Sequence, residues 1–239
     1  MKLLIDSGNS CLKWAEFKFG VLGNTQTIAY NDTDYLRRLQ EQWSQLSQPE
    51  AVYIACVAAI QLQLKNLLAK LWPTTPLVFI QSPSEKHGVT NAYPKEKSLG
   101  VDRWLVMTAA KNQYNGALCI VDCGTAITLD CIDENGMHLG GMIMPGWTLM
   151  QQSLFQGTAN IEANTDSYPL GLADNTQAAV FNGRLNAIKG FIGAGLSAMP
   201  NNYQLILTGG DATFLYDTLQ LDVILDANLV MKGIALEAA

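Results

Sequence analysis

The chain has 239 residues, of which 49% are hydrophobic and 15% are charged; its net charge is −6 at pH 7 and its pI is about 4.8. This composition excludes an intrinsically disordered chain, and the length allows one large domain or two smaller ones. Lys and Arg form no basic stripe, so we expect no nucleic-acid partner. No apolar stretch is long enough to span a bilayer, and the apolar run after Lys2 stops at Asp6, too short for a signal-peptide core. We therefore expect a cytoplasmic protein without membrane contact.

The first half predicts strands that alternate with helices. Short apolar runs predict strands at 2–6, 11–18, 51–57 and 76–80. Apolar residues at helical spacing predict a helix from Tyr35 and another over 60–71, which Pro73 ends. Residues 81–99 are expected to form a polar loop, and a helix is expected to begin near Gly100.

The second half continues this pattern. We expect one strand that ends at Asp122, another over 126–132, and a third up to about residue 143 after the turn 133–136. Pro145 and Gly146 precede an expected helix. We expect a helix over 174–197 with an interruption near Gly190. Residues 205–212 are expected to form a strand that runs into a Gly-rich turn and a helix, and residues 228–238 are expected to form a closing helix.

One motif occurs in both halves, as KLLIDSGNSCLKWAE (2–16) and LCIVDCGTAITLDCI (118–132). Glycine lets the backbone turn sharply after each Asp, successive N–H groups can form an anion-binding nest, and a nearby carboxylate can hold a phosphate-bound Mg²⁺. We therefore expect a duplicated α/β fold, with domains at 1–114 and 115–239, whose two turns face a cleft that binds a polyphosphate and its cation.

Other nucleotide and metal motifs are absent from the sequence. No G-x-G-x-x-G follows a strand and no Walker A motif occurs. The five cysteines include no C-x-x-C, and His87 and His138 lack ligand spacing, so we expect no zinc site and interpret both histidines as surface or turn residues.

The motifs IDSGNSCLK (5–13), VDCGTAIT (121–128) and TGGDA (208–212) resemble the two phosphate motifs and the adenosine motif of the actin, sugar-kinase and Hsp70 superfamily. Within it, GVDR (100–103), GGMIMPG (140–146), NT (175–176) and NLVMKGI (228–234) resemble type III pantothenate kinase. Ser10 stands where that family often has Thr, and GTANIEANTD (157–166) replaces a region that often contains Leu-Pro.

The resemblance implies a duplicated ribonuclease H-like, actin-like ATPase fold and ATP-dependent phosphorylation of pantothenate at its primary hydroxyl, the first step of coenzyme A synthesis. It implies that Asp102 accepts the proton and that Asp122 binds K⁺ or NH₄⁺, with Mg²⁺ accompanying ATP. The implied pantothenate positions are Tyr93, Gly100, Val101, Asp102, Arg103 and Thr176. The implied ATP positions are Asp6, Ser7, Gly8, Asn9, Ser10, Cys11, Leu12, Lys13 and Thr125. A homodimer is also implied, with the substrate and cation sites near the subunit contact.

Each residue also has a structural interpretation. Asp102 could serve only as an ion-pair partner of Arg103 at a helix start, where an acidic residue is favoured anyway. Tyr93 could be an ordinary loop aromatic, and Asp130 and Asp133 are expected to be solvated. Three other functions stay open: a sugar or acetate kinase of the superfamily, a catalytically inactive accessory factor for transcription, and a chaperone-like ATPase module.

Overall fold

The computed structural model of the chain describes residues 1–57, 60–95, 98–159, 161, 166–199, 202–220 and 222–239. These residues form two compact units, unit 1 (Met1–Gln113 with Asn228–Ala239) and unit 2 (Tyr114–Ala227). The sequence division placed the closing helix with the second half, whereas the structure places α7 (Leu229–Ala238) in unit 1. The physical reason is packing: α7 lies against α3 (Val101–Gln113) and β1 (Lys2–Ser7), and Gly233 allows its backbone to approach Leu105 closely.

Unit 1 is built on a mixed sheet whose strand order is β3-β2-β1-β5-β6, with β4 also pairing with β2. The antiparallel hairpin of β1 and β2 (Cys11–Lys18) confirms the first predicted pair, and β5 (Val52–Cys56) and β6 (Leu77–Phe79) continue the sheet in parallel. The sheet also contains the short strands β3 (Val21–Leu22) and β4 (Gln26–Ala29), which the sequence did not predict.

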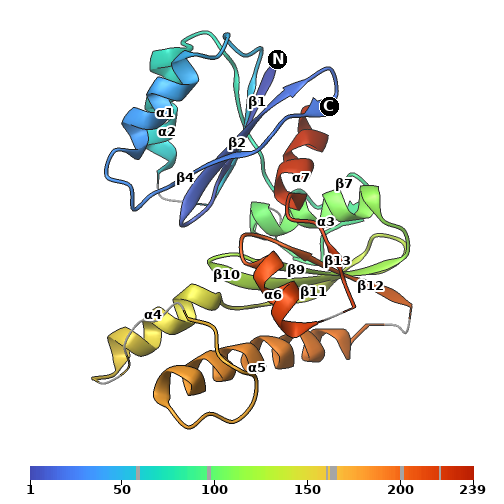
Figure 1. Cartoon of the computed structure of the whole chain (residues 1–239). Coiled ribbons are helices and arrows are strands. Elements are labelled where there is room, and N and C mark those ends of the chain that lie inside the picture. Colours follow the sequence, from blue (N-terminus) through green and yellow to red (C-terminus); the bar gives the residue numbers. More distant parts are fainter. Residues whose placement is uncertain (58–59, 96–97, 160, 162–165, 200–201, 221) are drawn as a thin grey trace. The chain divides into compact units, whose positions relative to one another are not determined.

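Two helices cover one face of this sheet, α1 (Tyr35–Ser44) and α2 (Gln61–Leu71). Figure 1 shows them side by side on one side of the strands, with α7 on the other side. The core beneath them contains Leu39 and Leu68 together with three tryptophans, Trp14, Trp43 and Trp72, which contact one another edge-on or stacked. The apolar stripes that predicted these helices therefore face the sheet.

The segment that the sequence interpreted as one polar loop contains a small hairpin, β7 (Glu85–Lys86) and β8 (Val89–Thr90). His87 and Gly88 make its turn with positive φ angles of 52° and 76°. Glu237 of α7 contacts both Lys86 and His87, so the hairpin is attached to the C-terminal helix. The interpretation of His87 as a turn residue is confirmed.

Unit 2 repeats the strand order of unit 1. Its sheet runs β11-β10-β9-β12-β13, with β9 (Ala117–Cys123), β10 (Ala126–Ile132) and β11 (His138–Pro145) antiparallel. The remaining strands, β12 (Tyr203–Thr208) and the short β13 (Ile224–Leu225), are parallel to β9. Thus β9 and β10 correspond to β1 and β2, and the repeated Asp-x-Gly motif occupies the same position in both sheets.

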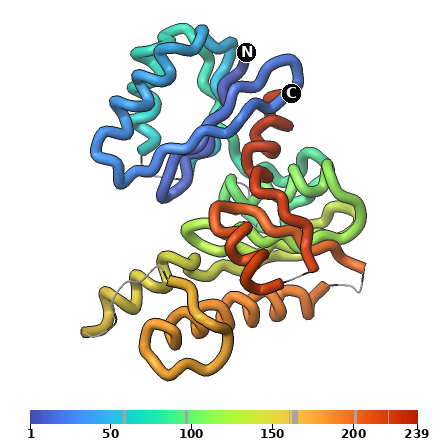
Figure 2. Tube along the Cα trace, viewed as in Figure 1, coloured from blue at the N-terminus to red at the C-terminus, as the bar shows by residue number. Residues whose placement is uncertain are grey.

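The helices of unit 2 are α4 (Trp147–Gly157), α5 (Thr176–Leu196) and α6 (Ala212–Leu219). Phe181, Leu185 and Ile188 of α5 pack on Val121 and Leu129 of the sheet. The trace in Figure 2 follows α5 as one continuous helix, so the interruption expected near Gly190 is wrong. Within the described part of the chain, no helix is long and apolar enough to cross a membrane.

Candidate active site

The first phosphate-type turn joins β1 to β2. The N–H of Gly8 donates to the carbonyl of Cys11 at 3.1 Å, which closes a tight loop over residues 8–11. Asp6 and Lys13 are register partners on the two strands, and Asn9 and Ser10 are exposed at the tip. The predicted ATP positions from Asp6 to Lys13 therefore form one continuous turn with its two strand ends.

Asp6 carries the most perturbed carboxyl of this region. Burial raises its pKa to about 6; the charge of Lys13 opposes this shift and the charge of Asp102 adds to it. The effect of Asp102 means that the structure brings the phosphate turn and the start of α3 together within unit 1. Two carboxylates that repel each other in a desolvated position favour a bound cation.

Asp102 lies in the first turn of α3, at the edge of the turn region. Its Oδ1 accepts the backbone N–H of Arg103 at 2.8 Å. A side chain at position 100 would place its Cβ 2.6 Å from that oxygen, so Gly100 is required for this conformation. The acidic residue also suits the positive end of the helix dipole.

Arg103 and Tyr93 form the second part of this group. The Arg103 guanidinium donates from Nη1 to the Tyr93 hydroxyl at 2.8 Å and lies over the Tyr93 ring at 5.4 Å. The Arg103 side chain is 5% exposed, and Val101 beside it is also buried. Asn91 Oδ1 accepts the N–H of Tyr93 and fixes the loop. The structure thus brings together all the predicted pantothenate positions of unit 1: Tyr93, Gly100, Val101, Asp102 and Arg103.

The second turn joins β9 to β10 and is one residue shorter: the N–H of Gly124 donates to the carbonyl of Ala126 at 3.2 Å. Thr125 is exposed at the tip, and Asp122 lies at the end of β9 opposite Thr128. Gly146, the end of the GGMIMPG motif, donates its N–H to the Thr125 carbonyl at 2.9 Å. A Cβ at position 146 would lie 2.2 Å from the Gly124 carbonyl oxygen, so only glycine fits against this turn.

The TGGDA turn lies directly beside Asp122. Gly209 has φ +95°, and a Cβ there would be 2.3 Å from Oδ1 of Asp122. Asp211 donates its N–H to the Cys123 carbonyl at 2.9 Å, and burial raises the pKa of the Asp211 carboxyl. The sequence prediction recognised this motif but assigned no site residue to it; the close packing identifies Gly209 and Asp211 as parts of the same region.

Thr176 is the first residue of α5 and is exposed. Its neighbour Asn175 caps the helix, since its Oδ1 accepts the N–H of Ala178 at 2.9 Å. Thr176, Asp122 and Thr125 all belong to unit 2. Residues 160 and 162–165, within the stretch that departs from the family pattern, lie outside the described residues.

Two sequence interpretations are wrong. His138 and Asp130 were expected at the surface, yet both are buried and Nε2 of His138 lies 3.0 Å from Oδ1 of Asp130. Asp130 is on β10 and His138 is on the neighbouring strand β11, so each side chain provides a hydrogen-bonding partner for the other. Cys119, Cys123 and Cys131 are buried, and Cys11 and Cys56 are half-buried.

The donor set fits hard cations held with the help of substrate and water. No group of three or more His, Cys, Asp or Glu side chains among the described residues could hold a metal ion by itself. Asp6 and Asp102 supply carboxylate oxygens in unit 1, and Asp122 supplies them in unit 2. Mg²⁺ typically binds through one or two carboxylates plus substrate phosphates and waters, which matches this arrangement.

Solved structures show the fold. The chain aligns with a Campylobacter jejuni protein assigned to the Baf family of transcriptional activators, with a TM-score of 0.61 and 24% identity over 99% of this chain and 98% of that one. A Bacteroides thetaiotaomicron protein described as having an actin-like ATPase fold gives a TM-score of 0.51 at 10% identity over 98% and 95% of the two chains. The duplicated actin-like ATPase fold is thereby confirmed.

Sequence comparisons show the family. The model of type III pantothenate kinase matches residues 2–197. A type III pantothenate kinase from Nitrosococcus oceani is 35% identical over 247 aligned positions, which cover 98% of this chain and 92% of that protein. The matched residues 2–197 include the two Asp-x-Gly turns and the GVDR segment. The chain therefore belongs to the type III pantothenate kinase family.

Proposed function

We propose that the chain transfers the γ-phosphate of ATP to the primary hydroxyl of pantothenate, the first step of coenzyme A biosynthesis. Membership of the type III pantothenate kinase family carries this proposal. The structural observation that supports it best is that the charge of Asp102 acts on the Asp6 carboxyl and raises its pKa, because a potential base then lies within electrostatic range of the first turn in unit 1.

The proposed reaction needs one proton acceptor and extensive charge neutralisation. Asp102 accepts the hydroxyl proton while the hydroxyl oxygen forms a bond to the γ-phosphorus and the bond to the β-phosphate oxygen breaks, which releases ADP. Oδ1 of Asp102 is held by the N–H of Arg103, so Oδ2 is assigned to the proton. The turn N–H groups of residues 8–10 in unit 1 are assigned to phosphate oxygens, and Thr125 is assigned to ATP from the family match.

Arg103 and Tyr93 are assigned to pantothenate, which is a carboxylate. A buried guanidinium can form a charge-assisted hydrogen bond with a carboxylate, a stronger contact than one between neutral groups. The Tyr93 hydroxyl already orients Nη1 of Arg103. Gly100, Val101 and Thr176 are assigned to the same substrate from the family match.

The proposed cations are Mg²⁺ with ATP and K⁺ or NH₄⁺ at Asp122. Asp122 lies between the second turn and Gly209, where carboxylate and backbone oxygens are available to a hard cation. The rate in K⁺ buffer should exceed the rate in Na⁺ buffer, and Asp122→Ala should remove that difference. Equal wild-type rates in the two buffers would contradict the assignment.

The homodimer and the cytoplasmic location are also proposals. Dimers with twofold symmetry are the commonest oligomers. In this chain, α4 has no buried residue and carries the exposed apolar side chains Leu149, Leu154 and Phe155. Together with α5, which it contacts, α4 is the candidate subunit interface.

A coupled kinase assay tests the proposed function. Purified protein with ATP and Mg²⁺ should produce ADP when pantothenate is added and should leave a panel of sugars and acetate unphosphorylated. Product formation with a sugar or acetate but not with pantothenate would assign the chain to another kinase activity. Absence of turnover with every acceptor would favour the catalytically inactive accessory factor.

A further inference from the structure

Tyr30 contacts both sides of the first phosphate turn, although no sequence motif includes it. It directly follows β4, whose pairing with β2 sets Ala29 opposite Cys11. Its backbone N–H donates to the carbonyl of Ser10 at 3.0 Å, and its hydroxyl lies 3.0 Å from Oγ of Ser7. One residue thus holds the entry and the tip of the turn.

Ser7 is the residue whose conformation depends most on this contact. Its side chain is completely buried at the end of β1, and its carbonyl accepts the N–H of Val57 at 3.1 Å. A buried hydroxyl that loses its partner is destabilised, because no water replaces the lost hydrogen bond. The Tyr30 hydroxyl therefore favours one orientation of Ser7, and with it one course of the backbone into Gly8.

The Tyr30 ring is itself held by α1. It packs edge-on against Tyr35, the first residue of that helix, with ring centroids 5.3 Å apart. The Tyr35 hydroxyl lies 3.4 Å from Oε1 of Gln63 in α2. The Tyr30 hydroxyl can donate at neutral pH, as that of an ordinary tyrosine can, and burial raises its pKa further. The turn is thereby connected to the helical layer of unit 1 (Figure 1).

We propose that Tyr30 is a positioning residue for ATP, which fixes Ser7 and Ser10 so that the N–H groups of residues 8–10 face the phosphates. This inference rests on the proposed assignment of residues 6–13 as the ATP phosphate turn. The Tyr30 ring packs against the helical layer, whereas its hydroxyl and backbone N–H fix the geometry of the turn.

Tyr30→Phe separates these two roles, because it keeps the ring and the backbone N–H and removes the hydroxyl. We expect the Kd for ATP, measured by calorimetry without pantothenate, and the KM for ATP to rise about 5–30-fold, the effect of one lost hydrogen bond at a buried position. The KM for pantothenate should change less than twofold. Tyr35→Phe is the matched control, since it removes the neighbouring hydroxyl outside the turn, and its Kd for ATP should equal that of the wild type.

A double-mutant cycle tests whether Tyr30 acts through Ser7. If it does, Ser7→Ala combined with Tyr30→Phe should weaken ATP binding no more than the weaker-binding single variant. Additive effects, or a Tyr30→Phe protein with a lower Tm and wild-type ATP affinity, would overturn the proposal. Wild-type protein that binds no ATP would overturn both the turn assignment and this inference. Protein that binds ATP without phosphorylating pantothenate would refute only the proposed function.

Discussion

At the scale of single residues, Asp102 has a structural contact and a proposed chemical role on the same carboxylate. Oδ1 accepts the Arg103 N–H, a contact that the amide oxygen of Asn can also make. In Asp102→Asn we therefore expect a kcat that falls about 10²–10⁴-fold, because the proton acceptor is lost, with little change in Tm or in ATP affinity. kcat and Tm should be measured on the same preparation.

Asp133→Asn is the matched control for this variant. Oδ1 of Asp133 also accepts backbone N–H groups, those of Asn135 and Met137, in a hairpin turn with no proposed role in catalysis. Its kcat should stay at the wild-type value. A stable Asp102→Asn protein with near wild-type kcat would show that no base is needed, or that the base is a different residue.

Asp6 predicts a pH dependence of stability. Its folded-state pKa of about 6 lies above the ordinary value of 3.8, so the folded state binds more protons than the unfolded state between these values. The free energy of unfolding should therefore fall as the pH rises through this range, by up to about 3 kcal/mol. Asp6→Asn has no buried carboxyl to ionise. Its free energy of unfolding should therefore rise relative to that of the wild type as the pH increases from 4 to 7.5. Denaturant unfolding of nucleotide-free protein at pH 4 and pH 7.5 measures this difference. If the free energies of unfolding of the wild type and of Asp6→Asn change in parallel with pH, the pH dependence does not come from Asp6.

At the scale of secondary-structure elements, the packing of α7 on α3 depends on Gly233. A Cβ at this position would lie 2.5 Å from the Leu105 carbonyl oxygen and 2.8 Å from its Cβ. Gly233→Ala should lower the free energy of unfolding by about 1–3 kcal/mol, since overpacking forces the helices apart. Gly193→Ala in α5 meets nothing within 4 Å and should instead raise it by about 0.5–1 kcal/mol through helix propensity. Equal effects at both sites would contradict the close approach of α7 to α3.

The elements that the sequence predicted share strong local signals. Apolar stripes identified α1 and α2, and the Asp-x-Gly turns identified both hairpins. The strands missed, such as β4 and β13, are too short to give a clear local signal and are partly exposed; each is stabilised by pairing with a neighbouring strand.

The candidate site shows the same limit. Asp102 and Arg103 could be predicted because they are adjacent in a motif. The contact between Ser7 and Tyr30 spans 23 residues, and the pairing of His138 with Asp130 depends on the register of β10 and β11. Neither contact has a local sequence signal, because side-chain partners across strands are set by tertiary pairing.

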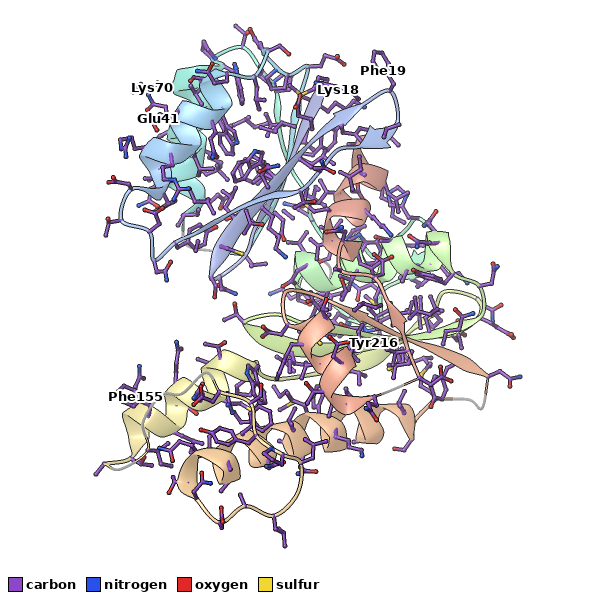
Figure 3. The ribbon with its side chains drawn as sticks, viewed as in Figure 1. Lys18, Phe19, Glu41, Lys70, Phe155 and Tyr216 are labelled. Atoms are coloured by element: carbon purple, nitrogen blue, oxygen red, sulfur yellow. The ribbon has the colours of Figure 1, made fainter. Side chains whose placement is uncertain are left out.

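At the scale of the whole molecule, the proposed homodimer needs an apolar surface on each subunit. Leu149, Leu154 and Phe155 are 41%, 36% and 50% exposed on α4, and Figure 3 shows the Phe155 side chain on this helix. α4 packs on the core of unit 2 through Trp147 and Met150, whereas these three side chains stay exposed, so burial against a second copy would remove their apolar surface from water.

We therefore expect light scattering to give the dimer mass for the wild type at micromolar concentration. Phe155→Ser should raise the dimer dissociation constant about tenfold or more, because each buried aromatic ring contributes about 1.5–3 kcal/mol. Phe19→Ser is the matched control: Phe19 is fully exposed in the turn after β2, and its replacement should leave the mass unchanged. A monomeric wild type would refute the dimer. A Phe155→Ser protein that dimerises as tightly as the wild type would show that the subunits meet elsewhere.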